Sequence, residues 1–359
     1  MKEPTLTFNR KERSVNEPRE ELVNAVERIE DALSDVNELL TGTEKKYRSS
    51  QRTSDPLPFN ELVRETAHSC SKHEIPFTVG INAKDERLTL DVTELPHLIV
   101  GGTTGSGKTT CLKNLLLYQL LFKSPREVKV TIIDPRRVEF LDFKGLPHLR
   151  CPVRSEMDEI VSELRSLRET GENRLEAMEK ASAKRFRDYR QASDRKDETG
   201  GDQEMEKPYN LVILDGLEML TQDAKQEIQG QLVWLSRLGK TAGIHLALST
   251  CDPSSEAVLG GLKSNIPARI ALTVTSGVDS RLMLGQNGAR DLNGNGDMLL
   301  ALPDKRDPIR LQAPFIKQES LDAICGYWED QRGESDMDTE WSLPDVSEVL
   351  FAAHEEAKR

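Results

Sequence analysis

The chain has 359 residues, a formal net charge of −12 at pH 7, and 36% hydrophobic and 31% charged residues. No apolar run approaches the ~18 residues that a membrane-spanning helix needs, and the N-terminus lacks the apolar core of a signal peptide. The sequence therefore predicts a cytoplasmic protein without membrane contact. The acidic balance argues against a surface coated with positive charge for nucleic acid. The 5 cysteines are widely spaced and form no metal-binding pair, which favours reduced thiols.

A heptad pattern marks the N-terminal segment. Its apolar positions alternate in steps of four and three residues: Leu22, Val26, Ile29, Leu33, Val36 and Leu40. Because a short coiled-coil helix is marginal alone, the Leu22–Leu40 helix needs an apolar partner. Two interpretations stay open: the helix packs on its own domain, or it binds a second copy or another protein. Residues 1–56 are expected to form a disordered arm, this helix and a linker.

Residues 57–317 alternate short buried-strand patterns with longer helical patterns. The expected strands are His97–Gly101, Val128–Ile133, Tyr209–Asp215, Ile244–Ser249, Ala268–Val274 and Met298–Leu302. Strands that are apolar on both faces and alternate with helices indicate a parallel sheet covered on both sides. The predicted fold class is therefore α/β, with a mostly parallel sheet and helices on both faces.

The segment after the first of these strands fits the phosphate-binding pattern GxxxxGK[ST]. Its residues are Gly102, Thr103, Thr104, Gly105, Ser106, Gly107, Lys108 and Thr109, and Thr110 opens the helix that follows. Glycines let the backbone curl around phosphates and turn its N–H groups inward. Lys108 offers a positive charge to the β- and γ-phosphates, and Thr109 offers a hydroxyl to Mg²⁺. Residues 102–110 are therefore predicted to bind ATP with Mg²⁺.

Two of the expected strands end in an aspartate, Asp134 and Asp215. Ligands bind at the carboxyl ends of the strands in such sheets. An apolar run followed by aspartate, as in Leu211–Asp215, is typical of the second motif of P-loop ATPases, in which the carboxylate holds Mg²⁺. A turn-capping aspartate is the plainer interpretation. The spacing after a phosphate-binding loop favours Asp215 as a metal-binding and catalytic residue.

Several strings resemble those of the FtsK/SpoIIIE DNA translocases, within the HerA–FtsK branch of RecA-like P-loop ATPases. They are Pro96–Lys108, Ile133–Arg136 with Glu139, Gly145–Leu149, Ala242–Leu246, Asn265–Ala271, Val278–Arg281 and Gly294–Leu299. The similarity runs from about Leu57 to Trp328. The resemblance implies a RecA-like motor domain over residues 57–332. An acidic linker and a short helix are expected over residues 333–359, the helix from about Val346 to Ala357.

The resemblance also implies partners, because such motors form a ring, usually a hexamer, with ATP between subunits and duplex DNA through the pore. Arg281, and less directly Arg269, then occupy positions that offer positive charge to a neighbour's nucleotide. A surface salt bridge is the alternative interpretation of Arg281. Lys108, Asp215 and Arg281 are the predicted catalytic residues.

Two catalytic positions depart from the pattern of the family that the chain resembles. The family has glutamate, which polarises the attacking water, directly after the aspartate of the third strand; here Gly216 follows Asp215. The family also has a glutamine that senses the γ-phosphate, where this chain has Cys251. Glu218 would point elsewhere unless the strand end bulges. Since water-positioning residues contribute ~10²–10⁴ in rate, we expect ATP binding with slow hydrolysis.

Five cations are candidate contacts to DNA phosphates: Lys184, Arg185, Arg187, Arg190 and Lys263. A solvated helix face is the alternative interpretation of the first four. Three functions follow from the sequence. The leading one is an FtsK-like ATPase that acts on duplex DNA as a ring-forming translocase or an ATP-gated clamp. The others are a nucleotide-binding scaffold or regulatory subunit, and an ATPase that moves protein, as in type VII secretion.

Overall fold

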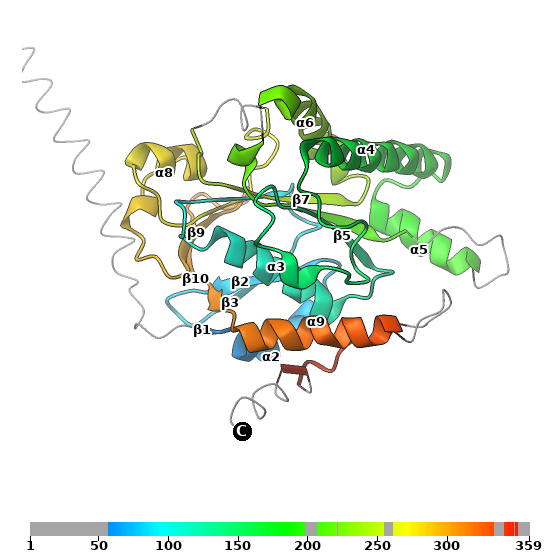
Figure 1. Cartoon of the computed structure of the whole chain (residues 1–359), viewed down its shortest axis with the longest axis horizontal. Coiled ribbons are helices and arrows are strands. Elements are labelled where there is room, and N and C mark those ends of the chain that lie inside the picture. Colours follow the sequence, from blue (N-terminus) through cyan, green and yellow to red (C-terminus); the bar gives the residue numbers. More distant parts are fainter. Residues whose placement is uncertain are drawn as a thin grey trace, which may run out of the picture. The chain divides into compact units, whose positions relative to one another are not determined.

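The computed structural model describes residues 57–197, 207–220, 222–254, 261–333, 341–347 and 349–350. A nine-stranded sheet with the order β3-β2-β10-β9-β8-β4-β7-β6-β5 forms its centre (Figure 1). The strands are β2 (Pro76–Ile81), β3 (Arg87–Asp91), β4 (Leu98–Gly101), β5 (Val128–Ile133), β6 (Tyr209–Leu214), β7 (Ile244–Thr250), β8 (Arg269–Ala271), β9 (Asp297–Ala301) and β10 (Ile309–Gln312). The heptad segment Leu22–Leu40 lies outside the described residues.

The strands from β8 to β5 in this order all pair in parallel. Every residue of β4, β6 and β7 is buried, which explains their continuous apolar sequences, because helices cover both faces of the sheet. This half of the molecule confirms the predicted α/β class. Parallel strands also end at the same edge of the sheet, so β4, β5, β6 and β7 bring their C-terminal residues together.

The other half of the sheet is antiparallel. Strand β9 pairs with β8 and β10, β10 pairs with β2, and β2 pairs with β3. The sequence patterns predicted β9 but not β2, β3 or β10. Strand β3 is partly exposed along its length, and β10 alternates Ile309 and Leu311 with Arg310 and Gln312. Such short mixed strands carry no continuous apolar signal.

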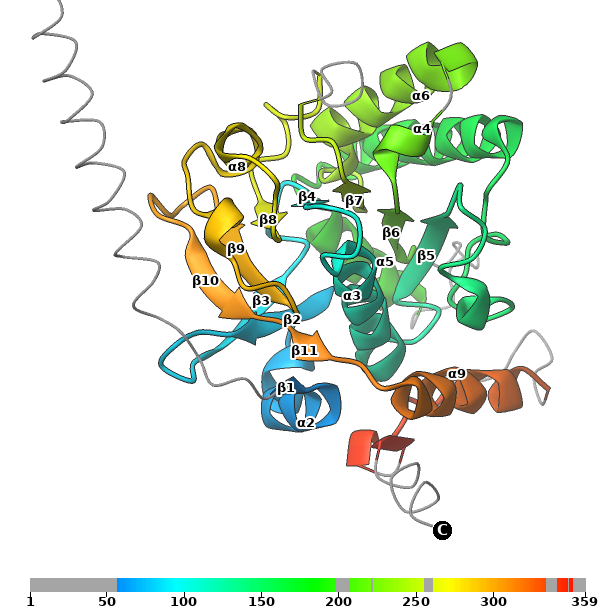
Figure 2. The same ribbon diagram turned by 60° about the vertical axis from the view of Figure 1, so that its left-hand side comes forward.

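Helix α3 (Lys108–Phe122) is enclosed by the rest of the domain. It contacts β4 and β7 of the parallel half and also β2 of the antiparallel half, so the sheet curls around it (Figure 2). Helices α2 (Phe59–Cys70) and α9 (Gln318–Gly333) close the open side of this curl. Burial on all sides accounts for the apolar composition of α3, which has no polar face.

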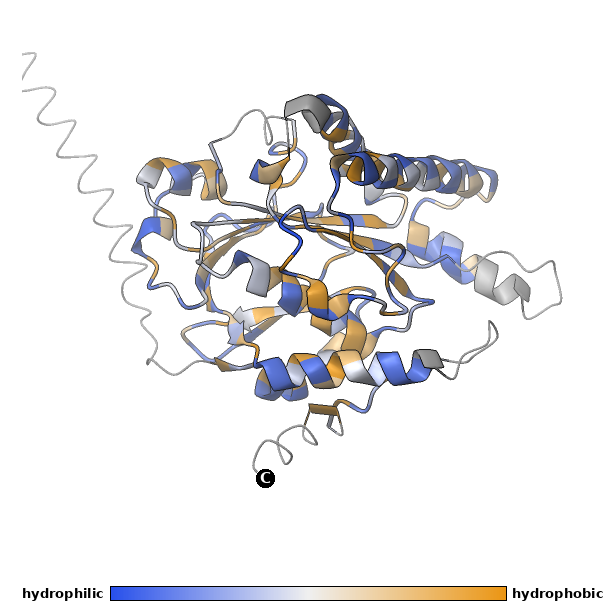
Figure 3. Ribbon diagram, viewed as in Figure 1, coloured by the Kyte–Doolittle hydropathy of each residue, from blue (hydrophilic) through white to orange (hydrophobic). Residues whose placement is uncertain are grey.

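The opposite face of the sheet carries α4 (Met157–Lys180) and α6 (Gln222–Trp234), which continues into the π-helical turn Leu235–Gly239. The buried residues of α4 recur at helical spacing, and its outer side is polar (Figure 3). Among the described residues, no helix is long and apolar enough to cross a membrane.

The described C-terminal residues pack on the domain that contains the nine-stranded sheet. Strand β1 (Leu57–Pro58) pairs in parallel with β11 (Pro314–Phe315). Leu350 is buried, and its carbonyl accepts a hydrogen bond of 3.1 Å from Asn60 of α2. The short helix expected from Val346 begins at that residue. The part of the segment 333–359 that the structure describes is therefore anchored to α2.

Candidate nucleotide site

The phosphate-binding loop occupies the turn between β4 and α3. Gly105 and Gly107 have φ angles of +79° and +106°, which residues with a Cβ adopt only under strain. A Cβ at either position would meet no atom within 4 Å, so this side of the loop is open. The first N–H groups of a helix have no intrahelical acceptor, which leaves those of Lys108, Thr109 and Thr110 to face an anion. The loop therefore fits a phosphate group.

Lys108 lies over its own loop. Its Nζ donates to the carbonyl of Gly102 at 2.9 Å and to that of Thr103 at 2.8 Å. Burial lowers the pKa of Lys108, while the nearby charges of Cys251, Glu218 and Asp215 act in the opposite direction. The ammonium group therefore stands among the acidic groups that follow the neighbouring strands.

Asp215 joins β6 to the start of α3. Its Oδ2 accepts a hydrogen bond of 2.7 Å from Thr109 Oγ1, and its Oδ1 accepts one from Ser249 of β7. The residue is almost fully buried. A hydroxyl and a carboxylate at this distance are the hard oxygen groups that Mg²⁺ prefers, and Mg²⁺ commonly binds one or two protein ligands together with substrate phosphates. The described residues hold no cluster of His, Cys, Asp or Glu that would form a separate metal site.

Asp134 holds a turn instead of facing the loop. Its carboxylate accepts backbone hydrogen bonds from Arg136 at 3.0 Å and from Glu139 at 2.9 Å. This turn directs the Arg136 side chain toward the end of β6, where Nη2 lies 3.0 Å from Glu218 Oε1. The aspartate thus has the turn-forming role, and the arginine after it reaches the neighbouring strand end.

Glu218 points back to the strand ends, which sequence reasoning did not foresee. Gly216 has a φ of +93°, and a single 3-10 turn, Leu217–Met219, follows it. Glu218 Oε2 accepts a hydrogen bond of 3.1 Å from the backbone N–H of Cys251. Burial alone would raise the pKa of Glu218, but hydrogen bonds from backbone N–H groups and from Cys251, with the charge of Arg136, outweigh it and lower the pKa. The carboxylate is therefore ionised at neutral pH.

The two arginines of the expected intersubunit contact differ in their surroundings. Arg281, on α8 (Gly277–Leu284), is exposed and donates to Asn287 Oδ1 at 2.8 Å. Arg269 donates to the backbone carbonyls of Ile266, Lys263 and Met283. Its guanidinium therefore fixes the chain around β8, and Arg281 is the more exposed of the two.

The candidate DNA contacts fall in two places. Helix α5 (Phe186–Asp197) carries Arg187 and Arg190, both paired with Glu74, at 3.0 and 3.6 Å. Arg185 pairs with Asp188, and Lys184 is exposed. Phe186 packs against Gly243, just before β7, so this helix lies at the end of the parallel strands opposite to the phosphate-binding loop. Lys263 lies elsewhere, in the segment before β8 that Arg269 holds.

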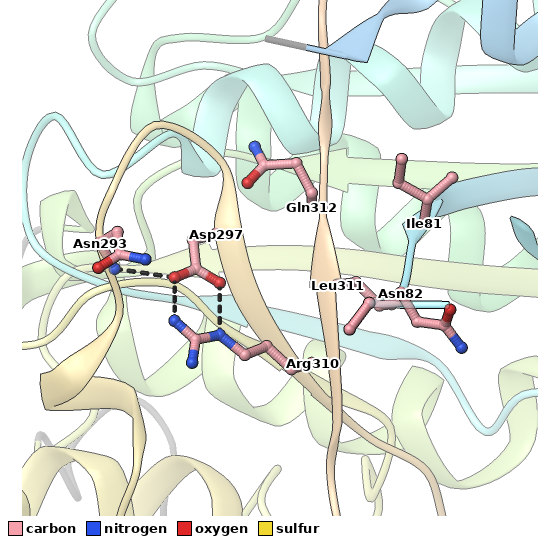
Figure 4. Close-up of a pocket in the computed structure, with 8 residues that line it drawn as sticks. Ile81, Asn82, Asn293, Asp297, Arg310, Leu311 and Gln312 are labelled. Atoms are coloured by element: carbon pink, nitrogen blue, oxygen red, sulfur yellow. Dashed lines mark hydrogen bonds and ion pairs between the residues drawn. The ribbon is translucent and has the colours of Figure 1, made fainter. Parts of the chain in front are cut away.

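A small cavity lies away from this site, between β2, β9 and β10 (Figure 4). It is lined by a buried ion pair in which Arg310 donates to both oxygens of Asp297, at 2.9 and 2.6 Å. The backbone N–H of Asn293 also donates to Asp297, at 2.8 Å. The carboxylate is therefore satisfied within the chain, and the pair locks the turn before β9 onto β10.

Comparison with known proteins identifies relatives of this chain. The FtsK/SpoIIIE family matches residues 60–255. The DNA translocase FtsK of Chlamydia pneumoniae is 33% identical over 269 residues, which are 74% of this chain and 33% of that protein. The DNA translocase FtsK of Streptococcus agalactiae serotype V is 34% identical, over 82% of this chain and 36% of that protein. The DNA translocase SpoIIIE of Bacillus subtilis is 32% identical, over 78% of this chain and 36% of that protein. The chain thus spans about a third of the length of these relatives.

Solved structures share the fold. The cytoplasmic domain of the type VII secretion ATPase EccC from Thermomonospora curvata aligns with a TM-score of 0.59 and 26% identity, over 71% of this chain and 31% of that one. The pCW3 conjugation coupling protein TcpA, with ATPγS, aligns with a TM-score of 0.60 and 22% identity, over 73% of this chain and 71% of that one. The fold is that of P-loop ATPase motor domains. With the family match over residues 60–255, the chain belongs to the FtsK/SpoIIIE family.

Proposed function

We propose that this chain is an ATP-binding motor domain that acts on duplex DNA, as a translocase or as an ATP-gated clamp. The curated relatives named DNA translocases share 32–34% identity with most of this chain. The observation that carries the proposal is the hydrogen bond of 2.7 Å between Thr109 at the phosphate-binding loop and Asp215 at the end of β6. It brings together the two oxygen ligands that a magnesium nucleotide needs.

In this proposal the loop 102–110 holds the phosphates of ATP through its N–H groups and Lys108. Thr109 and Asp215 hold Mg²⁺, which neutralises the charge that develops on the phosphates. Ser106, whose buried Oγ has no hydrogen-bond partner in the described part of the chain, is a further donor in the same loop. Copies of the chain assemble into a ring-like oligomer, hexameric as the family resemblance implies, and the exposed Arg281 contacts the nucleotide of the next copy.

Hydrolysis is slow in this proposal. Gly216 has no side chain to polarise water, and the thiol of Cys251 does not supply the paired donor and acceptor of an amide. Loss of water-positioning groups commonly costs ~10²–10⁴ in rate. A steady-state turnover in the tens per second that disappears in Lys108→Ala would contradict this part of the proposal.

Calorimetry with Mg²⁺-ATPγS tests the nucleotide site. The wild-type chain should bind, and Lys108→Ala should weaken binding at least about tenfold because the only phosphate-facing cation of the loop is lost. Lys84→Ala, at an exposed lysine on the β2–β3 turn, should bind like the wild type. No heat of association for a folded wild-type sample would refute the proposal.

A second candidate is an ATPase that moves protein. The similarity to the EccC cytoplasmic domain of a type VII secretion ATPase favours it. A third is a nucleotide-binding scaffold or regulatory subunit, favoured by the replaced residues Gly216 and Cys251. DNA-stimulated turnover that falls with salt supports the DNA motor. ATP-dependent oligomerisation without a response to DNA supports the scaffold, which would bind its protein partner through the Leu22–Leu40 helix.

A further inference from the structure

The carboxylate of Glu218 lies at the meeting point of three neighbouring strand ends. Arg136, after β5, approaches one oxygen at 3.0 Å, and the backbone N–H of Cys251, after β7, donates to the other at 3.1 Å. Glu218 itself follows β6, three residues after Asp215. The side chain is largely buried, with 16% of its surface exposed. Two donors on different elements therefore fix the carboxylate beside the nucleotide site.

The backbone turn at Gly216 explains how the side chain returns to this edge. A Cβ built on Gly216 would lie 3.5 Å from Glu218 Oε1 and 3.7 Å from Arg136 Nε. The carboxylate thus occupies the space next to the residue that directly follows Asp215. A φ of +93° is open to glycine without strain, so the turn and the missing side chain at position 216 go together.

The position is also electrostatically coupled to the phosphate-binding loop. Glu218 and Asp215 both act on the charge of Lys108, whose ammonium group lies on the loop. Donors on neighbouring elements keep this carboxylate ionised, and a carboxylate oxygen with two lone pairs can accept from water while it also accepts from the protein. Since phosphoryl transfer passes through a loose transition state, orientation of the attacking water matters more than the basicity of the group.

We propose that Glu218 is the carboxylate that orients the attacking water in ATP hydrolysis, with Arg136 and the Cys251 N–H as its positioning groups; the inference rests on the proposed function. The water oxygen forms a bond to the γ-phosphorus, and the bond from that phosphorus to the β–γ bridging oxygen breaks, with its electron pair leaving on ADP. The water proton passes through the Glu218 carboxylate to the released inorganic phosphate. The slow hydrolysis of this chain depends on Glu218.

The Glu218→Gln variant tests this role in two ways. Turnover should fall by at least about 10²-fold below the wild type. Removal of a negative charge beside the terminal phosphate should also favour ATPγS over ADP, so the ratio of their dissociation constants should shift toward ATPγS by about three- to tenfold. Calorimetry measures this ratio without any hydrolysis. A glutamate that only anchors Arg136 and β7 would change both affinities alike.

Two further variants complete the design. Glu74→Gln removes another half-buried carboxylate that pairs with arginines, at the opposite end of the strands, and should leave both readouts at wild-type values. Glu218→Asp keeps the charge but shortens the side chain, so the affinity ratio should stay unchanged while turnover falls. In case Glu218→Gln does not fold, the turnover of Glu218→Asp tests the role of Glu218 in its place.

The outcomes separate this inference from the proposed function. If the wild type binds nucleotide and Glu218→Gln keeps both its turnover and its affinity ratio, the role of Glu218 is overturned and the nucleotide site stands. If the wild type binds no nucleotide, the proposed function itself fails. If wild-type turnover is too slow to measure, the affinity ratio alone decides.

Discussion

Ser249 is a single side chain that fixes two consecutive positions of the neighbouring strand. Its Oγ donates to Asp215 Oδ1 and accepts from the backbone N–H of Gly216 at 2.9 Å. The residue is fully buried in β7. A buried donor left without an acceptor costs free energy, so the orientation of the Asp215 carboxylate and the turn that returns Glu218 depend on the same hydroxyl.

Ser249→Ala should lower the free energy of unfolding by ~1–3 kcal/mol, because the Gly216 N–H loses its acceptor. Urea denaturation measures the loss. The variant should also bind Mg²⁺-ATPγS more weakly, since Asp215 is no longer held. Ser71→Ala, at an exposed serine after α2, serves as the control and should change neither quantity. Wild-type stability in Ser249→Ala would contradict the assigned hydrogen bonds.

At the scale of elements, α5 is held to the sheet by close packing and by arginine contacts. Arg174 of α4 donates to the carbonyls of Ala242 at 3.1 Å and Pro208 at 2.7 Å, and its guanidinium lies over the Phe186 ring at 4.6 Å. The same ring covers Gly243, whose φ is +72°. The helix α5 therefore stabilises the fold by packing on the sheet, independently of any contact with DNA.

Gly243→Ala should destabilise the fold by ~2–4 kcal/mol. Its Cβ would lie 2.3 Å from Phe186 Cδ1, and the backbone conformation is strained for alanine. Gly230→Ala provides the matched control: this exposed glycine of α6 has open space where the Cβ would stand. That variant should gain ~0.5–1 kcal/mol from helix propensity. Thermal or urea unfolding of the two variants should therefore shift in opposite directions.

The exposed cations just before α5 test the contact with DNA. If Lys184 and Arg185 bind phosphates, the double alanine variant should reduce the slope of log affinity against log salt by about 2. Lys305→Ala with Arg306→Ala removes the same charge from the exposed β9–β10 turn and should leave the slope unchanged. Fluorescence anisotropy with a labelled duplex gives both slopes. Equal losses in the two double variants would assign the effect to net charge.

The sequence predicted the elements of the parallel half well and the antiparallel half poorly. The expected runs at Val128–Ile133 and Ile244–Ser249 match β5 and β7 to within a residue, because both strands are buried on both faces. Strands β3 and β10 pair with the strands just before them, but both mix polar and apolar residues, and β2 joins β10 from far along the chain, which no local pattern records. The phosphate-binding loop was found because its conformation needs a fixed spacing of glycines.

The contacts around the phosphate-binding loop could not be predicted from the spacing of residues in the sequence. Arg136, Glu218 and Ser249 follow or end three different strands, and their contacts exist only once those strands lie side by side. The return of Glu218 also needs the positive φ of Gly216, which a lone glycine after an aspartate does not predict.

At the scale of the whole molecule, three buried histidines make stability depend on pH. Burial lowers the pKa of His97 to about 4, of His148 to about 4 and of His245 to about 3. The unfolded chain takes up these protons near the usual histidine pKa of 6.5, but the folded chain does not. Above pH 6.5 these histidines therefore cost no stability. As the pH falls from 6.5 toward their folded-state pKa values, the free energy of unfolding decreases.

Between pH 7.5 and pH 4.5, each of these histidines should cost ~2–3 kcal/mol of unfolding free energy. His245→Leu should remove one such contribution, because neither of its ring nitrogens has a hydrogen-bond partner in the described structure. Urea denaturation at both pH values measures the difference. The exposed His68 is the control, and His68→Gln should keep the wild-type pH dependence. An unchanged pH dependence in His245→Leu would contradict the assignment.

The enclosure of α3 connects the nucleotide site to a remote aromatic ring. Lys108 and Thr109 form the first turn of this helix, while near its other end the carbonyl of Leu120 accepts a hydrogen bond of 2.8 Å from the indole of Trp328. The indole is fully buried and stacks edge-on against His148. Any rotation or shift of the helix would alter the polarity around that ring. Trp328 is thus an intrinsic fluorophore, and its emission can report a movement at the N-terminal end of α3 without a label.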